Sequence, residues 1–473
     1  MGRKGRSHSE PDCSPNALNA AFIRKVDSIC DPLEGAPMPA IGAPRGAQPT
    51  LRAFRPVDAA QARDVLGSVK PTHSAGDDEV PMSMLVRCRA QLGHHVAALA
   101  NAVITSGRWP GEWKRAVITP VWKKRGSRHD PSVYRPISLL PAISRVVERL
   151  IATQLKAHMR RAGVLPQHQH GFTPKRSCET AVLHLVDLVA TARDQEHAEA
   201  VLVASADCSA AFDTVGHGIL LQKLDRACGV EGLAHELFRS YLEGRKQRTQ
   251  MSSGLSDWRD TSGRSPRGVP QGSVLGPLLF ALYTADIAEH VTEARIVAYA
   301  DDITLVVSDR DPAECKAKME RAMAQLETYC RQNRIAPEPT KTQLLPVGSV
   351  AQMRQLRELS CEMGEHSIKP KNVIKVLGVL LDSRLSWEDH SAAAARRACN
   401  ATWAIARAAQ HLKVAERGAL LQALAHPHLD YCQTALAEPS VRAVDVVKRS
   451  YNRTARVAVH GLRALYRPWR MRP

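Results

Sequence analysis

The chain has 473 residues, and its 65 lysines and arginines exceed its 47 aspartates and glutamates, which gives a formal net charge of +18 at pH 7. Hydrophobic residues make up 44% of the chain, which excludes a wholly disordered protein and is enough for a large buried core. The positive surplus favours an anionic partner, either nucleic acid or a membrane surface. No run of roughly eighteen uncharged apolar residues occurs, so the sequence predicts no transmembrane helix.

The cysteines and histidines do not form a metal-binding pattern. The eleven cysteines are scattered, and no two of them stand in a C-x-x-C pair. This argues against a disulfide framework and a zinc finger, and it predicts a reducing, intracellular compartment. His94, His95, His168 and His170 lack a second ligand pair at metal spacing, so we interpret them as structural or surface residues. The polar, basic start at Met1–Glu10 predicts no secretory signal.

The N-terminal part of the chain shows little periodicity. Residues 1–55 contain seven prolines and five glycines, and residues 71–81 form another polar stretch. Such a composition is typical of a flexible connection. We therefore predict a disordered arm or linker over residues 1–84.

Clear secondary-structure signals follow further along the chain. Apolar residues at helical spacing begin after Pro141 and predict a helix that ends near Gly163. Residues 200–208 form an apolar run that ends on a carboxylate, which indicates a buried strand, and residues 296–307 form a hairpin pattern with acidic residues at its turn. Residues 373–381 predict a further strand. Helical patterns then cover residues 390–413, 415–425 and 440–459.

The acidic residues of these strands suggest a metal site. Asp301 and Asp302 are adjacent at the predicted hairpin turn, and Asp207 ends the other candidate strand. Like charges this close raise each other's pKa unless a cation lies between them. Mg²⁺ prefers carboxylate oxygen and keeps ligand positions for water and phosphate. If the two strands are neighbours in one sheet, the carboxylates could share two metal ions for phosphoryl transfer; otherwise the Asp-Asp pair is ordinary turn chemistry.

Several segments stand in a characteristic order. Tyr299–Asp302 reads Tyr-Ala-Asp-Asp, the run from Asp207 reads Asp-Cys-Ser-Ala-Ala-Phe-Asp-Thr-Val, and Gly268–Phe280 contains Val-Pro-Gln-Gly. Further segments lie at 113–124, 134–139, 169–172, 341–342 and 376–387. This set, spread over roughly residues 85–400, resembles the reverse transcriptases of non-LTR (LINE-type, jockey/ingi-like) retrotransposons. Group II intron maturases share the Tyr-x-Asp-Asp box, but the Ser-Ala-Ala-Phe-Asp and Leu-Gly-x-x-Leu-Asp-Ser runs fit the LINE-type enzymes better.

The resemblance implies a polymerase site. Asp207, Asp301 and Asp302 correspond to the catalytic, metal-binding carboxylates of the family, with the backbone carbonyl of Cys208 as a further metal ligand. Two Mg²⁺ ions, or Mn²⁺ in their place, are the implied cofactors. The implied reaction is attack of a primer 3′-hydroxyl on the α-phosphate of a dNTP, directed by an RNA template.

The resemblance also assigns residues to the substrates. Phe212 corresponds to an aromatic gate against the ribose 2′-hydroxyl, although a plain core phenylalanine is the alternative. Gln271, Lys341 and Arg135 correspond to nucleotide-binding residues, and a solvated surface lysine is the alternative for Lys341. For nucleic-acid binding the resemblance assigns Lys123, Lys124, Gly272, the primer-grip pair Leu377 and Gly378, and Arg449 and Arg453.

Two positions depart from the family pattern. Thr173 stands where the family commonly has an arginine that binds the triphosphate, and Glu338 stands where it usually has an asparagine. Neither change touches the carboxylates. They leave open an alternative function, a decayed or co-opted reverse-transcriptase-derived protein that binds nucleic acid without activity.

The C-terminal end is strongly basic. Residues 441–473 hold nine lysines and arginines and a single acid, Asp445, with Tyr451, Tyr466 and Trp469 interleaved. Cationic side chains for phosphates and aromatic rings for bases suit a nucleic-acid strand. The alternative is a solvated helix face.

These observations predict an α+β protein with the right-hand polymerase fold of fingers, palm and thumb, a disordered N-terminal arm and a helical, basic C-terminal region. The expected domains are an arm at 1–84, fingers and palm at 85–350, and a primer-grip strand region with a thumb-like helical domain at 351–473. The expected partners are an RNA template, a DNA primer or target and dNTPs, with no membrane, and the insertion chemistry implies action in the nucleus. About 80 residues precede the finger motifs, too few for an endonuclease domain, so we expect a separate or missing endonuclease.

Overall fold

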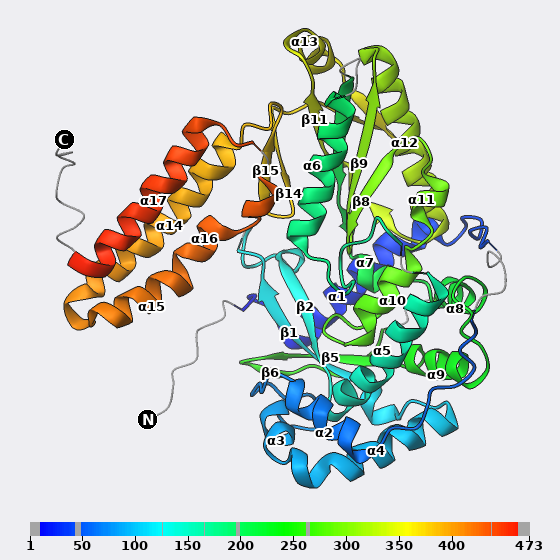
Figure 1. Cartoon of the computed structure of the whole chain (residues 1–473). Coiled ribbons are helices and arrows are strands. Elements are labelled where there is room, and N and C mark those ends of the chain that lie inside the picture. Colours follow the sequence, from blue (N-terminus) through cyan, green and yellow to red (C-terminus); the bar gives the residue numbers. More distant parts are fainter. Residues whose placement is uncertain are drawn as a thin grey trace. The chain divides into compact units, whose positions relative to one another are not determined.

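The computed structural model describes residues 10–42, 49–124, 126–164, 166–194, 199–261, 265–436 and 438–461. The chain divides into two compact units, and Figure 1 shows the elements of both. The first unit comprises Met1–Phe172, Cys208–His290 and Leu326–Pro337, and the second comprises Thr173–Asp207, Val291–Gln325 and Glu338–Pro473. Each unit mixes helices with strands, which confirms the α+β class.

A sheet with helices around it forms the first unit. Strand β1 pairs antiparallel with β2 and parallel with β5, and the short strands β6 and β7 pair with β5. The helices of this unit are α1 (Pro15–Cys30), α2 (Ala59–Ser68), α3 (Met82–Arg87), α4 (Arg89–Ser106), α5 (Ala142–Ala162), α7 (Ala211–Thr214), α8 (His217–Arg226), α9 (Gly232–Leu242), α10 (Leu275–Tyr283) and α11 (Ile287–His290). Its strands are β1 (Arg115–Trp122), β2 (Tyr134–Leu139), β4 (Cys208–Ser209), β5 (Lys246–Met251), β6 (Gly254–Leu255), β7 (Arg259–Asp260) and β10 (Ala336–Pro337). The predicted helix after Pro141 is confirmed as α5, which ends at Gly163 in the left-handed conformation.

The prediction of a disordered arm over residues 1–84 is wrong for the described residues of that range. Helix α1 begins after Ser14, whose hydroxyl caps the first turn, and Pro15 occupies the first helical position. Leu18 and Phe22, one helical turn apart, are buried in a cluster with side chains of β1 and β2. Helix α2 likewise begins with a capping box at Asp58. The prolines and glycines of this region therefore separate short folded elements.

Removing the Leu18 side chain tests whether α1 belongs to the core. Leu18 is fully buried, so Leu18→Ala is expected to lower the free energy of unfolding by about 3 kcal/mol through lost burial and the cavity left behind. Arg24→Ala, at an exposed position of the same helix, should change it by less than about 0.5 kcal/mol. Urea unfolding measures both variants. An unchanged midpoint for Leu18→Ala would show that α1 contributes nothing to the fold.

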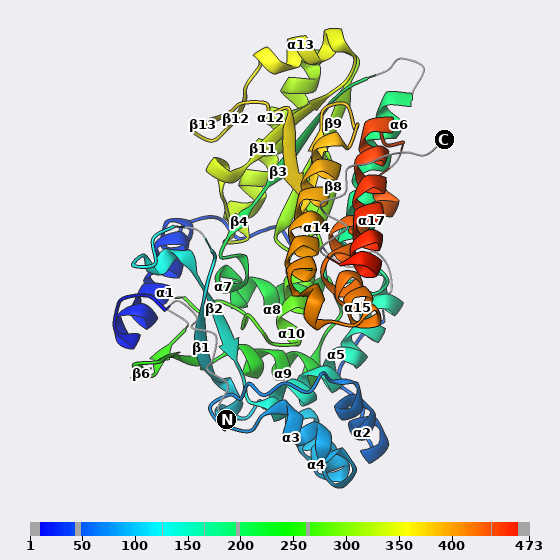
Figure 2. The ribbon, with the colours of Figure 1, turned by 90° about the vertical axis from the view of Figure 1, so that its left-hand side faces the viewer.

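A four-stranded antiparallel sheet forms the centre of the second unit. Its strand order is β11 (Gln343–Val347), β3 (Ala200–Ala206), β9 (Asp302–Asp309) and β8 (Arg295–Tyr299), and Figure 2 shows these strands in the upper part of the ribbon. The predicted strand at 200–208 and the predicted hairpin at 296–307 are thus confirmed, and they are neighbours in one sheet.

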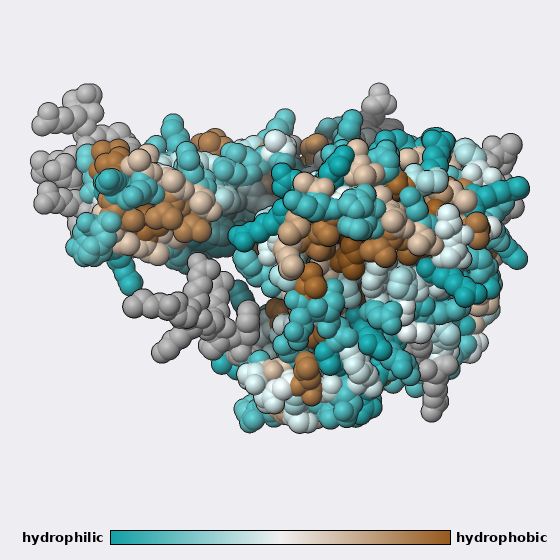
Figure 3. Space-filling model, turned by 90° about the horizontal axis from the view of Figure 1, so that it is seen from below, coloured by the Kyte–Doolittle hydropathy of each residue, from teal (hydrophilic) through white to brown (hydrophobic). Residues whose placement is uncertain are grey.

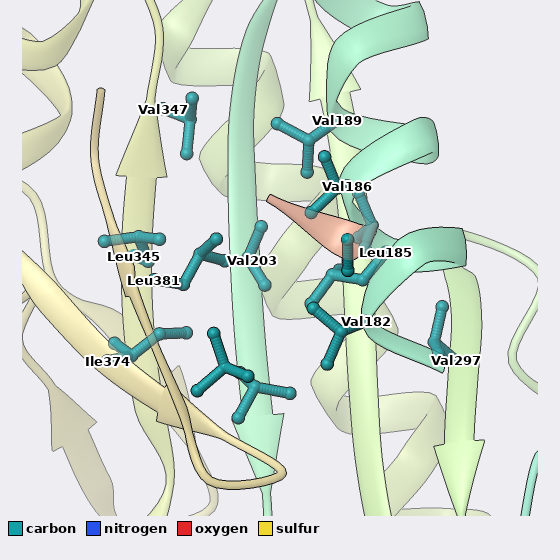
Figure 4. Packing of buried hydrophobic residues seen from close by; sticks show 14 of the residues in the cluster. Val182, Leu185, Val186, Val189, Val203, Val297, Leu345, Val347, Ile374 and Leu381 are labelled. Atoms are coloured by element: carbon teal, nitrogen blue, oxygen red, sulfur yellow. The ribbon is translucent and has the colours of Figure 1, made fainter. Parts of the chain in front are cut away.

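Helix α6 (Cys178–Asp194) and the hairpin β14–β15 (Val373–Val376 and Val379–Asp382) cover one face of this sheet. Figure 4 shows Val182 and Val186 of α6 packed toward Val203 of β3, with Ile374 and Leu381 of the hairpin beside Val203. The prediction of a single strand at 373–381 is wrong. The backbone reverses at residues 377 and 378, whose φ values are 47° and 87°, and this two-residue turn splits the apolar run into two paired strands.

The remaining elements of the second unit are mostly helical. They are α12 (Pro312–Gln332, which continues into the first unit), α13 (Val350–Glu358), β12 (Cys361–Met363), β13 (His366–Ile368), α14 (Glu388–Ala408), α15 (Val414–Leu424), α16 (His426–Asp430) and α17 (Val441–His460). The three predicted C-terminal helices are confirmed as α14, α15 and α17. Figure 3 shows apolar surface beside hydrophilic surface on this helical lobe, at the left of the view, and exposed apolar residues here include Val414 and Leu424. Within the described part of the chain, no helix combines the length and apolar character needed to cross a bilayer.

Candidate active site

Three aspartates lie at one end of the sheet in the second unit. In the antiparallel register of β3 and β9, Ala206 pairs with Ile303, so Asp207 follows at the end of the sheet that carries Asp302. In the hairpin β8–β9, Tyr299 pairs with Asp302 across a two-residue turn, and Asp301 is the second residue of that turn. The structure therefore brings together the three carboxylates that the sequence singled out.

Charged neighbours surround this end of the sheet. Lys341 Nζ lies 3.2 Å from Asp207 Oδ2 and 3.5 Å from Glu338 Oε2. The backbone N–H of Glu338 donates to the Asp207 carbonyl at 2.8 Å, which holds the start of the short helix at Pro339–Lys341 beside the end of β3. Lys341 therefore contacts one of the three carboxylates, and Glu338, which differs from the usual family residue, shares its charge.

Asp302 is the carboxyl most affected by its surroundings. Although its residue is exposed at the start of β9, partial desolvation together with the charges of Asp301 and Asp207 raises its pKa to about 6. The part of this shift that comes from Asp301 and Asp207 reflects negative charge that no nearby cation compensates fully. A cation at this place would relieve the repulsion.

The donor set fits a hard divalent cation in kind. Carboxylate oxygens are the ligands that Mg²⁺ prefers, and three carboxylate side chains belong to this end of the sheet. Among the described residues, however, no group of three or more His, Cys, Asp or Glu side chains is gathered closely enough to hold a metal ion. Binding would therefore require the carboxylates to reorient, with Asp207 exchanging part of its contact with Lys341 for the ion.

Phe212 and Gln271 lie together in the first unit. The Phe212 ring stacks on Phe280 with 4.9 Å between centroids, and Phe172 meets it edge-on at 6.2 Å. Gln271 Nε2 donates to Asp213 Oδ2 at 2.7 Å, and the Val269 N–H donates to the Phe212 carbonyl at 2.8 Å. The two motifs are therefore joined, and desolvation raises the pKa of Asp213 to about 7 against the lowering effect of its bond from Gln271.

The loop that carries Gln271 is fixed from two sides. The Ser138 N–H of β2 donates to the Gln271 carbonyl at 3.0 Å, and Gly272, at φ 116°, approaches Ser138 so closely that a Cβ would lie 2.6 Å from its carbonyl oxygen. Buried Glu148 of α5 accepts hydrogen bonds from Val274 N and Leu275 N at 2.7 and 2.9 Å and so caps α10.

Sequence reasoning missed Glu148 and Asp213. An acid inside the apolar stripe of a predicted helix was the available signal for Glu148.

The remaining predicted residues of the first unit lie on and after β1 and β2. Arg135 is exposed on β2, and Lys124 is exposed with φ 60°. Lys123 Nζ donates to the Ser132 carbonyl at 2.8 Å. Cys208 is paired with Pro337 in a two-residue ladder. The ladder is this short because Pro337 and Pro339 flank Glu338, and proline has no N–H to continue the hydrogen bonds between strands.

In the second unit, Leu377 and Gly378 form the turn between β14 and β15, where Tyr431 Oη donates to the Leu377 carbonyl at 2.6 Å. Sequence reasoning did not single out Tyr431. Arg449 and Arg453 lie exposed on α17, where they contact Asp445 and the Cys399 Sγ respectively. The predicted nucleic-acid contacts of Tyr466 and Trp469 fall outside the described residues.

Residues 122–381, more than half of the chain, match the family model described as reverse transcriptase (RNA-dependent DNA polymerase). The chain belongs to this family. Enzymes of the family generally use a divalent metal ion, which agrees with the chemistry of the three carboxylates.

Similar proteins come from mobile elements of flies. The chain is 30% identical over 354 residues to a probable RNA-directed DNA polymerase from transposon BS of Drosophila melanogaster, a match that covers 73% of this chain and 38% of that protein. It is 28% identical to the corresponding protein of the X-element, over 71% of this chain and 36% of the relative, and 24% identical to the RNA-directed DNA polymerase of jockey, over 70% and 36%. The chain therefore spans well under half of the length of these relatives. Their similarity places it among distant homologues of non-LTR retrotransposon reverse transcriptases.

Proposed function

We propose that this protein is the RNA-directed DNA polymerase of a non-LTR retrotransposon, which extends a primer 3′-hydroxyl with dNTPs on an RNA template. The observation that carries the proposal is the meeting of Asp207, Asp301 and Asp302 at one end of the sheet, in a chain of this family. Insertion of such an element takes place on chromosomal DNA, so we place the action of the protein in the nucleus.

In this proposal the three carboxylates and the Cys208 carbonyl hold two Mg²⁺ ions. When bound, the ions favour ionisation of the primer hydroxyl and stabilise the charge of the leaving pyrophosphate. The chain's own residues position the reactants, which supplies much of the rate in phosphoryl transfer. Lys341, whose Nζ lies 3.2 Å from Asp207 Oδ2, would neutralise a phosphate of the incoming nucleotide.

We assign the parts of a right-hand polymerase to the chain as follows. Residues 85–350 form fingers and palm, with the sheet β11-β3-β9-β8 as the palm, and residues 351–473 form the primer-grip hairpin and the thumb. Arg449 and Arg453, both exposed on α17, contact the backbone of the template–primer duplex. Phe212, Gln271 and Arg135 contact the nucleotide, and Lys123, Lys124 and Gly272 contact the template.

Primer extension tests the proposed function. The purified full chain is expected to incorporate dTTP on poly(rA)/oligo(dT) in the presence of Mg²⁺, and EDTA is expected to stop the reaction. Binding of the duplex without extension would instead favour the alternative of an inactive nucleic-acid-binding protein. The pairing of Glu338 with Lys341 is the observation behind that alternative, because it places an acid beside the lysine proposed to receive phosphate.

The raised pKa of Asp302 predicts a pH dependence of metal binding. Its proton must leave before the carboxylate can ligate, so Mg²⁺ affinity is expected to rise as the pH increases through about 6 and to level off above it. Isothermal titration at pH 5 and pH 7.5 measures this. In Asp302→Asn, which cannot ionise, the affinity should be weak and the step near pH 6 should disappear. The same step in both proteins would assign the titration to another group.

A further inference from the structure

The segment that follows α16 attaches to two other elements of the second unit. Tyr431 Oη donates to the Leu377 carbonyl in the β14–β15 turn at 2.6 Å. Three residues later, Thr434 N and Oγ1 donate to Glu179 Oε1, in the first turn of α6, at 3.2 and 2.5 Å. The hydrogen bond of Tyr431 therefore holds the proposed primer-grip turn, and those of Thr434 hold helix α6, which covers the sheet.

The β14–β15 turn is a strained structure that benefits from such a tie. Its first residue, Leu377, has φ 47°, a left-handed conformation that is unfavourable for a residue with a side chain. Its second residue, Gly378, has φ 87° and lacks a side chain, and a Cβ built there would lie 3.4 Å from Tyr431 Cε1. The Tyr431 ring thus packs directly on the turn backbone while its hydroxyl binds the carbonyl.

Tyr431 is also connected to the hairpin that carries the aspartates. Tyr299 packs against the same apolar cluster of the second unit as Leu377, and the Cys178 thiol together with desolvation raises the pKa of Tyr299 to about 12. Tyr299 pairs with Asp302 across the β8–β9 turn. The two turns are therefore supported by one apolar cluster, and Tyr431 holds the first of them through the Leu377 carbonyl.

We propose that Tyr431 is a positioning residue that fixes the Leu377–Gly378 turn relative to the Asp301–Asp302 turn, and thereby sets where a primer 3′ end meets the carboxylates. The proposal rests on the polymerase function proposed above. Its chemical basis is that reaction rate depends steeply on the alignment of the attacking hydroxyl, whereas duplex affinity depends on many backbone contacts elsewhere. Loss of the tie should therefore impair the incorporation step more than binding.

The test compares two variants of the full chain. Tyr431→Phe removes the bond to Leu377 and keeps the ring, whereas Thr434→Val removes the side-chain tie of the same segment to Glu179. In Tyr431→Phe the rate of single-nucleotide incorporation from bound primer is expected to fall about 10-fold, with the Kd for the template–primer duplex and the KM for dNTP within about two-fold of wild type. Thr434→Val should retain the wild-type rate. A wild-type rate in Tyr431→Phe, or an equal fall in Thr434→Val, would overturn the proposal.

A second measurement separates this proposal from the polymerase function. Amide hydrogen exchange of Val376–Val379 in the protein alone is expected to accelerate in Tyr431→Phe and to stay unchanged in Thr434→Val, because only the first variant releases the turn. If the wild-type protein fails to extend primers, the polymerase function fails and the exchange rates still decide whether Tyr431 fixes the turn. Unchanged exchange in Tyr431→Phe would overturn the positioning role by itself.

Discussion

Asp301→Ala is expected to abolish primer extension while leaving the protein folded. Loss of a residue that only orients a metal ligand typically costs 10–100-fold, so loss of a ligand itself should lower the rate by more than about 100-fold. Asp301 occupies the tight turn between β8 and β9 and belongs to none of the buried clusters of the described residues. The free energy of unfolding should therefore change by no more than about 0.5 kcal/mol. Rapid-quench primer extension and thermal unfolding measure the two effects.

Asp309→Ala is the matched control for this variant. Asp309 is the last residue of the same strand β9, at the opposite end of the sheet, where it pairs with Lys318 at 2.6 Å. Its loss should remove a surface ion pair worth less than about 1 kcal/mol and leave extension at the wild-type rate. Equal rates for Asp301→Ala and wild type would remove the carboxylates from the chemistry, and an equal loss in both variants would indicate a general effect on the strand.

Local patterns in the sequence predicted the strands β3, β8 and β9 of the sheet that holds the site, but not β11. Residues 200–206 are apolar apart from Ser205 because β3 is a central strand, covered on both faces, and Asp207, which follows, marks the end of the sheet. The pairing of β3 with β9 came from the resemblance, because neighbouring strands in space need not be neighbours in sequence. The turn at Leu377 was missed because leucine is a poor turn residue, and packing and the Tyr431 hydroxyl hold it there.

The composition of the N-terminal region gave no indication of helix α1. The prolines around α1 and the glycines after it suggested a linker, yet Ser14 and Pro15 are a helix start and Leu18 and Phe22 are one turn apart. Its partners lie in β1 and β2, about a hundred residues away along the chain. Tyr431 and Glu148 were missed for the same reason, since each gains its role from a contact distant in sequence.

The structure accounts for the position of only part of the net charge of +18. Of the basic residues in 441–473, Arg442, Lys448, Arg449, Arg453 and Arg456 lie on described parts of α17, whereas the others lie outside the described residues. Arg442 pairs with Glu388 and Arg449 with Asp445, whereas the exposed Arg453 contacts the Cys399 sulfur. This arrangement leaves positive charge on the helix surface, which is what binding to phosphates requires.

The packing around Phe212 fixes the orientation of its ring, which is what the proposed role as a gate requires. The ring is half-buried, with one side stacked on the buried Phe280 and its orientation further limited by Phe172. A ring held in this way cannot turn aside to admit a 2′-hydroxyl, because protein interiors are closely packed and side chains there occupy single rotamers.

Phe212→Val is therefore expected to admit ribonucleotides. The smaller side chain leaves space for the hydroxyl, and the ratio of kcat/KM for rNTP over dNTP should rise about 100-fold, a size typical of a steric contact of a few methylene groups. Steady-state incorporation of rUTP and dTTP on poly(rA)/oligo(dT) measures the ratio. Phe280→Leu is the control, because it removes the stacked partner and a comparable amount of packing while keeping the Phe212 ring. If both variants raise the ratio equally, the discrimination comes from packing around the site, and if neither does, Phe212 is a core residue.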